Sequence, residues 1–478
     1  MSHPSGLERR YEPRGENPQT LSAESRNATS DGSPQMGEVL DALAPRMPSG
    51  YRRTDTGVMP EDWESLSVHR IASSKPNSIV GGPFGSELVS KDYVARGIPV
   101  IRGQNMSGRW VSGDFVFVTP AKARALEANL AHPGDIVFTQ RGTLGQVSLV
   151  PEKPFRAYVV SQSQMKLSVD LGVADPLYIF YFFESQEQQK SIQRSAIQTG
   201  VPHINLGILR ALPVRVPPLP QQRAIAAVLM DADALIGSLE ALIAKKRAIK
   251  RAAMQQLLTG RTRLPGFSGE WETRTLGELG AFRKGKGIRR TELRDTGFPC
   301  VRYGELYTRY ENYVIHPVSR IPTDVAATAL RIERGELLFA GSGETAEEIG
   351  MCVAYIGEEP AYAGGDIIVL RVSGEDAVYL AHLLNAPVAA RQKARMAQGD
   401  AVVHIRSDHL AEVEFPLPPL SEQRAIVAVL TDMDAEIAAL ERRLDKTRAI
   451  KQGMMQQLLT GAIRLPIPDA VAEDEPGR

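Results

Sequence analysis

An internal duplication constrains this chain more than any other feature of its sequence. Residues 217–265 and 418–466 align at an offset of 201 without a gap, and 31 of the 49 aligned positions are identical. A match of that quality does not arise by chance, and its period is far too long for a solenoid repeat. The chain therefore holds a duplicated unit of domain size.

The segments that precede the two copies are related only weakly. Residues 97–102 read GIPVIR and correspond to residues 297–302, which read GFPCVR. Residues 134–138 correspond in the same way to residues 335–339. The duplicated segments are thus near copies, whereas the regions between them share only a skeleton. We call the former the constant segments and the latter the variable domains, and we infer that only the variable domains are meant to differ.

The duplication sets the predicted domain organisation. The first residues are rich in Ser, Pro and Gly with few apolar side chains, which is typical of a disordered tail. The predicted parts are a disordered tail (1–50), the first variable domain (51–216), the central constant helix (217–266), the second variable domain (267–416), the C-terminal constant helix (417–466) and a short tail (467–478).

Both constant segments are predicted to be long amphipathic helices. Their apolar residues recur at the three- and four-residue spacing of one helical face. Ser421 is a candidate N-cap, and Gly260 and Gly461 are candidate left-handed C-caps. About 38 residues lie between the caps, so each helix would be roughly 57 Å long.

A helix of that length with an apolar stripe has to pack against a partner. The two copies are predicted to form an antiparallel coiled coil, because the chain returns through a whole domain before the second copy begins. The alternative is two amphipathic helices that pack in separate cores. The residues predicted to lie in the helix–helix interface are Ile225, Leu229, Ile236, Leu239, Ile243, Ile426, Leu430, Ile437, Leu440 and Leu444.

The variable domains are predicted to be mixed α/β, which makes the whole chain α+β with an internal pseudo-two-fold duplication. Short runs rich in β-formers alternate with Gly, Pro and Asn turns in the first domain. These predicted strands span 98–102, 115–119, 135–139, 146–150 and 164–169, and more helical stretches follow at 176–193 and 377–396.

Catalytic motifs are absent from the sequence. It contains no HExxH, no GxSxG and no paired CxxC, and it lacks the (N/D)PPY and FxGxG motifs of an amino-methyltransferase. Residues 280–287 have the spacing of a phosphate-binding loop, but Gly287 stands where Ser or Thr would reach Mg²⁺. We therefore expect no catalytic residue, metal site or cofactor in this chain. Two cysteines, no long apolar run and no signal segment favour a cytoplasmic protein without a membrane anchor.

Two groups of side chains suit contact with nucleic acid. A basic, Gly-containing segment near residue 285 could approach a phosphate backbone, although a solvated basic loop is the alternative. Arg, Gln and Asn side chains in the first variable domain could form bidentate bonds to bases, although structural roles are the alternative for each. The candidate DNA contacts are Gly85, Ser86, Arg102, Gln104, Asn105, Gln140, Arg141, Thr143, Arg283, Lys284, Lys286, Arg289, Arg290, Arg302, Tyr303 and Ser342.

The charge balance limits how the chain could hold DNA. It has 56 basic and 56 acidic residues, which at face value argues against a nucleic-acid partner. That neutrality is a cancellation, because residues 217–266 carry a net charge of +5 and residues 267–416 a net charge of −5. The chain would not bind DNA by bulk charge, and we expect weak binding when it is alone.

These motifs together resemble the specificity subunit of type I restriction–modification systems. The resemblance is carried by the repeated PPLxxQRAIxxxL…LLTGxxRLP motif, by residues 57–63 (GVMPEDW), by residues 82–86 (GPFGS) and by residues 265–271 (PGFSGEW). It extends over residues 50–466, nearly the whole chain. The second variable domain departs from the pattern, because it lacks GPFGS and has Ser342 where the first has Arg141.

The resemblance implies a DNA-reading subunit with no catalysis of its own. Each variable domain would be a target-recognition domain for one half of a split double-stranded DNA target, and the helices would fix the gap between the halves. The implied partners are two methyltransferase subunits, which flip and methylate adenine, and two restriction subunits. S-adenosylmethionine, ATP and Mg²⁺ would act only in those partners. Near-identical helices would offer the same surface to two identical subunits.

Other functions explain the sequence less completely. A specificity subunit of a related restriction or phage-defence system with a different nuclease partner would carry the same motifs. A self-contained DNA methyltransferase or nuclease would need the motifs that are absent. A purely structural coiled-coil scaffold would not explain two domain-sized regions that have diverged while the helices have not.

Overall fold

The computed structural model describes residues 49–54, 57–198, 200–399 and 402–466. Residues 1–48 of the predicted N-terminal tail and the predicted tail at 467–478 lie outside the described residues. The chain divides into two compact units, 1–61 and 62–478. In the first unit, β1 (Tyr51–Thr54) and β2 (Gly57–Pro60) form an antiparallel hairpin. The elements below all belong to the second unit.

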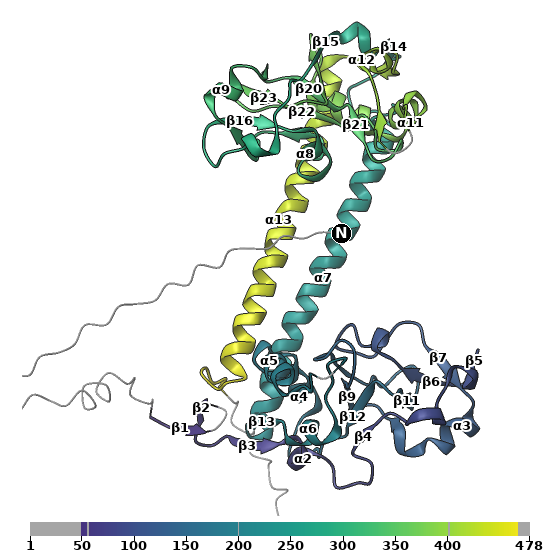
Figure 1. Ribbon diagram of the computed structural model, residues 1–478, viewed down its shortest axis with the longest axis vertical. Coiled ribbons are helices and arrows are strands. Elements are labelled where there is room, and N and C mark those ends of the chain that lie inside the picture. Colours follow the sequence, from purple (N-terminus) through teal and green to yellow (C-terminus); the bar gives the residue numbers. More distant parts are fainter. Residues whose placement is uncertain (1–48, 55–56, 199, 400–401, 467–478) are drawn as a thin grey trace, which may run out of the picture. The chain divides into compact units, whose positions relative to one another are not determined.

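Two long helices have the same length and correspond at the offset of the duplication. They are α7 (Leu219–Leu257) and α13 (Leu420–Leu458), each of 39 residues (Figure 1). Gly260 and Gly461 have φ angles of 66° and 75°, the predicted left-handed conformation. They are not the C-caps, however, because Leu258 and Leu459 cap the helices two residues earlier. The predicted N-cap is wrong by two residues, because the extended Pro419 caps α13 and Ser421 lies inside its first turn.

The helices run antiparallel, as ion pairs between them show. Lys451 Nζ lies 2.8 Å from Asp233 Oδ1, and Lys250 pairs with Asp434. Asp233 and Asp434 correspond at the offset of 201, and so do Lys250 and Lys451. The second ion pair is therefore the first with the two helices exchanged. The helix pair is therefore related to itself by a pseudo-two-fold axis, as the duplication predicted.

Only the middle of the helix pair forms a pure helix–helix interface. Leu239, Ile243 and Leu444 make an apolar cluster with Ile236 and Leu440, as predicted.

The outer apolar residues face the domains instead. Ile426 and Leu430 belong to the core of the second domain, and Ile225 and Leu229 are buried at the corresponding place on α7. Ile437 is buried beside a cleft that reaches the second domain. An apolar stripe on an α-helix drifts around its axis relative to a strict heptad, so the two ends of the stripe point in other directions than its middle.

The first variable domain contains two sheets. The four-stranded sheet has the order β10-β9-β12-β4 and the five-stranded sheet the order β5-β7-β6-β11-β8. Their strands are β4 (Ile79–Gly81), β5 (Tyr93–Val94), β6 (Ile98–Ile101), β7 (Val116–Val118), β8 (Leu130–Ala131), β9 (Ile136–Thr139), β10 (Val147–Leu149), β11 (Tyr158–Val160) and β12 (Gln164–Leu167). All five predicted strands are present, each within one to two residues of its predicted ends.

The second variable domain repeats this plan. Its sheets have the orders β15-β24-β20-β22-β17 and β18-β16-β23-β19, and β21 pairs with β25. The strands are β15 (Gly280–Lys284), β16 (Phe298–Val301), β17 (Tyr313–Val314), β18 (Ser319–Ile321), β19 (Leu330–Ile332), β20 (Glu336–Ala340), β21 (Ser342–Gly343), β22 (Cys352–Tyr355), β23 (Ala361–Ala363), β24 (Ile367–Val372) and β25 (Val403–His404).

Short helices and one strand pair complete each domain. The predicted helical stretches are each two helices, because Ser185 caps the second helix in one and Pro387 starts the second helix in the other. The helices are α2 (Val68–Ile71), α3 (Pro120–Ala125), α4 (Pro176–Glu184), α5 (Gln186–Ser195) and α6 (Leu206–Ala211), then α8 (Tyr303–Thr308), α9 (Thr323–Ala326), α10 (Ala377–Asn385), α11 (Pro387–Met396) and α12 (Ser407–Ala411).

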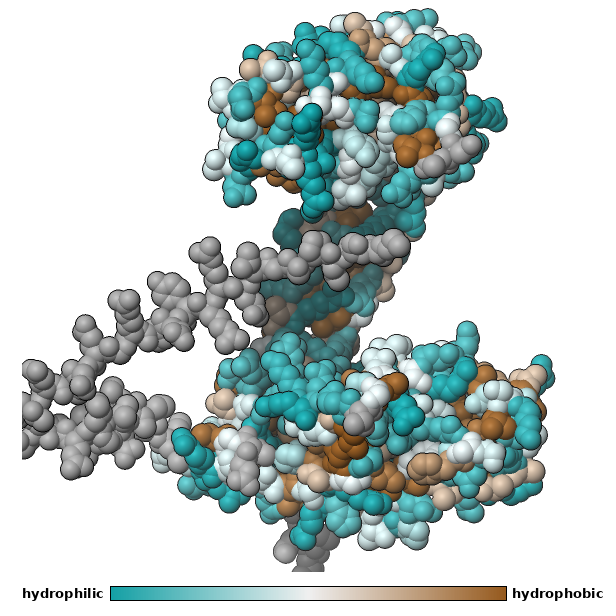
Figure 2. All heavy atoms as spheres, viewed as in Figure 1, coloured by the Kyte–Doolittle hydropathy of each residue, from teal (hydrophilic) through white to brown (hydrophobic). Residues whose placement is uncertain are grey.

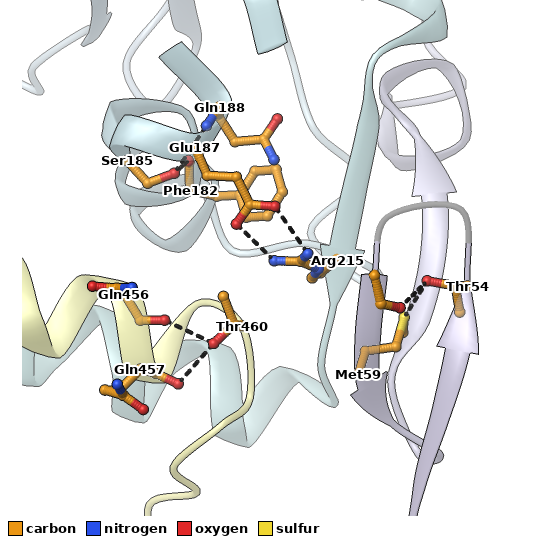
Figure 3. A network of polar contacts seen from close by, with 11 residues as sticks. Thr54, Met59, Phe182, Ser185, Glu187, Gln188, Arg215, Gln456, Gln457 and Thr460 are labelled. Carbon is orange, nitrogen blue, oxygen red and sulfur yellow. Dashed lines mark hydrogen bonds and ion pairs between the residues drawn. The ribbon is translucent and has the colours of Figure 1, made fainter. Parts of the chain in front are cut away.

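The strand that leads into each long helix also closes its domain. In the first domain β3 (Glu64–Ser67) pairs with β13 (Pro213–Val216), and in the second β14 (Glu272–Thr275) pairs with β26 (Glu414–Leu417). Arg215 in β13 is buried and donates hydrogen bonds to both carboxylate oxygens of Glu187 in α5, at 3.0 and 3.1 Å (Figure 3). These bonds connect β13 to α5. The start and end of each domain are thus fixed together at the base of a helix.

Candidate nucleic-acid interface

The candidate contacts of the first domain gather at one edge of its four-stranded sheet. The strands β4 and β9 both run antiparallel to β12, so the loops after them leave the sheet at the same edge. Gly85 and Ser86 follow β4, whereas Gln140, Arg141 and Thr143 follow β9.

Hydrogen bonds to the turn before β12 hold these loops together. Gln162 Nε2 donates to Gly85 O at 2.7 Å, and Gln140 N donates to Ser163 O at 2.7 Å. Ser161 N donates to Ile101 O at 3.1 Å, which brings the end of β6 and the adjoining Arg102 to the same place. The candidate contacts that follow β4 and β9 in the four-stranded sheet and Arg102, which follows β6 in the five-stranded sheet, therefore lie on one surface.

Asn105 has a structural role in place of the predicted base contact. Its side chain is fully buried, accepts a hydrogen bond from Arg102 N at 3.1 Å and donates to Ser112 O and Asp114 O at 3.0 Å. Neither face of its amide remains available to a base. Gln104, its exposed neighbour, donates to Asp114 O at 3.1 Å and keeps its carbonyl oxygen free of any hydrogen bond in the described residues.

The second domain builds the corresponding edge from other residues. Its loops after β15 and β20 meet at the turn before β24, where Gly285 N donates to Ile367 O at 2.8 Å and Gly341 N donates to Asp366 O at 2.7 Å. A cleft of about 590 Å³ opens there, and Lys284, Ser342, His404 and Arg406 are among its lining residues.

Arg283 points away from this edge, contrary to what its place in the basic cluster suggested. Its guanidinium pairs with Glu336, the first residue of β20 at the opposite edge of the sheet, and lies 3.4 Å from Arg331 O. Arg371 Nε lies 2.7 Å from the same carboxylate. Glu336 is buried, and an unpaired buried carboxylate would be costly, so both arginines are needed to compensate it.

The remaining basic residues of the cluster stay on the surface. Buried Ile288 anchors the loop after β15, while the side chains around it are exposed. Among the described residues no acidic group lies within ion-pair distance of Lys284, Lys286, Arg289 or Arg290. Tyr303 is exposed, and Arg302 follows β16, whose Val301 O accepts a hydrogen bond from Gly364 N. Lys284, Lys286, Arg289 and Arg290 are therefore free to contact phosphate groups.

Sequence reasoning missed His203 and His404. His404 Nδ1 lies 3.0 Å from Ser342 Oγ, and His203 forms a β-bridge with Arg141. The signal that could have found them is their separation of 201 residues, the offset of the duplication.

No nucleophile or metal cluster stands out in the described part of the chain. Burial raises the pKa of the Cys300 and Cys352 thiols to about 12, which disfavours a thiolate. The described residues contain no group of three potential metal ligands and no helix long and apolar enough to cross a membrane. Hydrophilic residues dominate the visible surface of both variable domains, with hydrophobic patches between them (Figure 2).

Comparisons with known proteins agree on one family. The model of the type I restriction modification DNA specificity domain matches residues 88–247 and again residues 268–448. The type I restriction enzyme MjaVIII specificity subunit of Methanocaldococcus jannaschii is 25% identical over 427 residues, which cover 85% of this chain and 94% of that protein. The putative MjaX specificity subunit of the same organism is 23% identical over 442 residues, covering 87% and 97%.

Solved structures show the same fold. The S subunit of a type I restriction–modification system from M. genitalium aligns with a TM-score of 0.51 at 19% identity, covering 85% of this chain and 96% of that chain. A chain from a type I system, solved to explain complex assembly and conformational transition, also has a TM-score of 0.51, at 16% identity and with 85% and 99% covered. Since one family model matches both halves, this chain belongs to the type I restriction–modification DNA specificity family and is a specificity subunit with two target-recognition domains.

Proposed function

We propose that this chain is the non-catalytic subunit that reads a bipartite double-stranded DNA target and recruits methyltransferase and restriction subunits to it. One observation carries the proposal. The ion pairs of the helix pair repeat at the offset of 201, whereas the corresponding sheet edges of the two domains carry different side chains. Repeated helices suit two identical partners, and different edges suit two different half-sites.

The long helices would act as the ruler between the half-sites. Each has 39 residues and is therefore about 58 Å long, more than one turn of B-DNA. The first domain is bonded to the start of α7, where Asp175 N donates to Gln222 Oε1 at 2.8 Å. The second is bonded to the start of α13 in the same way, since Asp376 N donates to Gln423 Oε1 at 2.9 Å. Because the helices are antiparallel, the two domains attach at opposite ends of the pair.

The catalytic steps of DNA methylation and restriction would take place in the partner subunits. We propose two methyltransferase subunits, which use S-adenosylmethionine, and two restriction subunits, which use ATP and Mg²⁺. This chain would contribute base contacts from its two sheet edges and docking surfaces from its helices, within the cytoplasm. A related defence system with a different nuclease partner would use the same geometry, and it would be distinguished by the nuclease that co-purifies with the complex.

Methylation assays with purified subunits test this proposal. The chain alone, mixed with DNA and S-adenosylmethionine, should transfer no methyl groups, and adding the methyltransferase subunit should produce sequence-specific methylation. Methylation by the isolated chain would contradict the proposed division of labour.

A domain exchange tests the modular reading. Replacing residues 60–216 by the corresponding domain of another specificity subunit should change one half-site and leave the other intact. Mapping methylated adenines by long-read sequencing would show the outcome, and a change in both half-sites would refute independent reading.

A further inference from the structure

A short backbone pairing lies between α5 and α6 in the first domain and between α11 and α12 in the second. We call the described residues of each pairing, 197–198 with 200–203 and 398–399 with 402–404, the hairpin. In the first domain, Ile197 N donates to His203 O at 2.8 Å, and His203 N donates back to Ile197 O at 3.2 Å. In the second domain, Gln398 and His404 exchange the same two bonds at 3.0 and 2.7 Å. The hairpin is thus one of the features that the diverged domains still share.

The hairpin is fastened to the loop that carries candidate DNA contacts. Ile204 N donates to Gln140 O, and Ile405 N donates to Gly341 O, both at 3.0 Å. Donor and acceptor positions correspond at the offset of 201 in the two domains. The hairpin therefore lies directly beside residues 140–141 in one domain and residues 341–342 in the other.

The local geometry turns one histidine of each hairpin outward. Ile204 and Ile405 are buried, with 1% and 3% of their surface exposed. Successive side chains on an extended strand point to opposite sides, so the residue before each isoleucine faces the surface. His404 is exposed and His203 half-exposed.

The fold explains the isoleucines but not the histidines. Residues 196–206 and 397–407 are identical only at an alanine, a valine, the histidine and the isoleucine, so the histidine is the one polar residue retained. Any residue could make the backbone bonds. The two rings also have different neighbours, because His404 Nδ1 lies 3.0 Å from Ser342 Oγ, whereas His203 Nδ1 lies 3.1 Å from Val201 O.

We propose that His203 and His404 each contact a base edge, one in each half of the DNA target. The inference rests on the proposed function and adds two specificity-determining residues to it. An imidazole ring can donate a hydrogen bond to, or accept one from, the groups that bases present in the major groove. At His404 the surrounding cleft also holds Lys284, which can contact the adjoining phosphate.

The test compares single substitutions in the full chain assembled with its methyltransferase subunit. A library of plasmids in which each base of the half-sites is varied would be methylated and sequenced. The His203→Ala variant should lower the preference for one base pair of the first half-site by about tenfold and leave the second half-site unchanged. His404→Ala should do the reverse.

Matched controls separate base reading from folding. His132 and His316 are exposed histidines at the opposite edges of the two domains, and their alanine variants should keep both half-site preferences. The variants His203→Gln and His404→Gln keep a polar side chain, and each should alter the preferred base while the thermal unfolding midpoint stays near that of the wild type. These glutamine variants carry the test even where an alanine variant folds poorly.

The possible failures are distinct. If His203→Ala and His404→Ala change neither half-site, change both together, or lower methylation uniformly without altering any base preference, the two histidines do not read bases. If the wild-type complex methylates no DNA, the proposed function itself is wrong.

Discussion

The two junctions between the domains and the helix pair use the same helix residues and different domain residues. At the first junction Asp233 accepts hydrogen bonds from Tyr181 Oη at 2.8 Å and Arg109 Nη1 at 3.2 Å, and it pairs with Lys451. Lys451 also lies 3.1 Å from Glu184. The first domain is therefore joined to both helices by a network of five charged or polar side chains.

The second junction keeps the helix pair of charges and replaces the rest. Lys250 pairs with Asp434, but its further acidic neighbour is the exposed Glu311, at 3.8 Å. At the offset of 201, Tyr181 corresponds to His382 and Glu184 corresponds to Asn385. Neither ring nitrogen of His382 has a hydrogen-bond partner among the described residues. The comparison teaches that the helices were retained as a common support while each domain evolved its own attachment to it.

The apolar part of the two junctions should contribute equally, and this is the largest effect that we expect. Leu229 and Leu430 correspond at the offset of 201, and both are completely buried. Replacing either by Ala should lower the free energy of unfolding by about 2–5 kcal/mol, measured by urea titration. Leu242→Ala, at a partly exposed position, should cost much less. A large cost for only one of the two buried leucines would break the pseudo-two-fold symmetry of the cores.

The second junction should be sensitive to acid. Burial, and then the charge of Lys250, lowers the pKa of His382 from 6.5 to about 4. Between these two pH values the unfolded chain binds a proton that the folded chain does not, so stability is complete above pH 6.5 and falls as the pH drops towards 4. The full loss should be about 3 kcal/mol.

Unfolding measured against pH would check this difference between the junctions. His382→Tyr places the residue of the first junction in the second, and it should remove the acid-dependent loss. The charges that face His382 besides Lys250 are Asp434 and Asp376, which oppose the shift and remain in the variant. An unchanged pH profile in His382→Tyr would show that another group causes the acid sensitivity.

The polar part of the junctions should contribute unequally. Asp233→Asn removes the charge that three groups of the first junction share, whereas Asp434→Asn removes a charge that pairs only with Lys250 among the described residues. We expect a destabilisation of about 2 kcal/mol for the first and about 1 kcal/mol for the second. The reason is that a hydrogen bond to a charged group contributes more to stability than a hydrogen bond between neutral groups. Equal costs in urea titrations would mean that Arg109 and Tyr181 add nothing to the attachment.

The exposed ion pairs on the helix pair should matter least. Arg448 lies 2.6 Å from Glu240, and Arg247 lies 2.5 Å from Glu441, two contacts that also correspond at the offset of 201. All four side chains are substantially exposed, so Glu240→Gln and Glu441→Gln should each change stability by about 0.5 kcal/mol or less. The small effects should match each other and shrink further in high salt.

Local and repeated features could be predicted from the sequence. The left-handed turns at Gly260 and Gly461, two residues beyond the C-caps of the long helices, could be predicted because a positive φ is a property of one residue and its neighbours. The predicted strands were present because alternation and turn residues act over a few positions. The split of each helical stretch was missed, although its signals are also local, since Ser185 caps a new helix and Pro387 starts one.

Roles that depend on distant partners could not be predicted. Arg283 belongs to a basic run in the sequence, yet it serves a buried carboxylate, Glu336, across the sheet. Asn105 resembles a base-reading residue, yet its amide donates to Ser112 O and Asp114 O in the loop that follows its turn. His203 and His404 became candidates only when hydrogen bonds placed them beside the loops at residues 140–141 and 341–342.

The sequence by itself determined that this chain has two equal helices and two unequal domains. The reason is that the duplication is visible as identical residues at a fixed offset, without any knowledge of tertiary contacts. The tertiary structure decided which apolar residues of the helices face each other and which face a domain, and which charged residues remain on the surface. These outcomes depend on pairing between residues far apart in the chain. Burial makes an unpaired charge costly, so the structure as a whole selects the partner of each charged side chain.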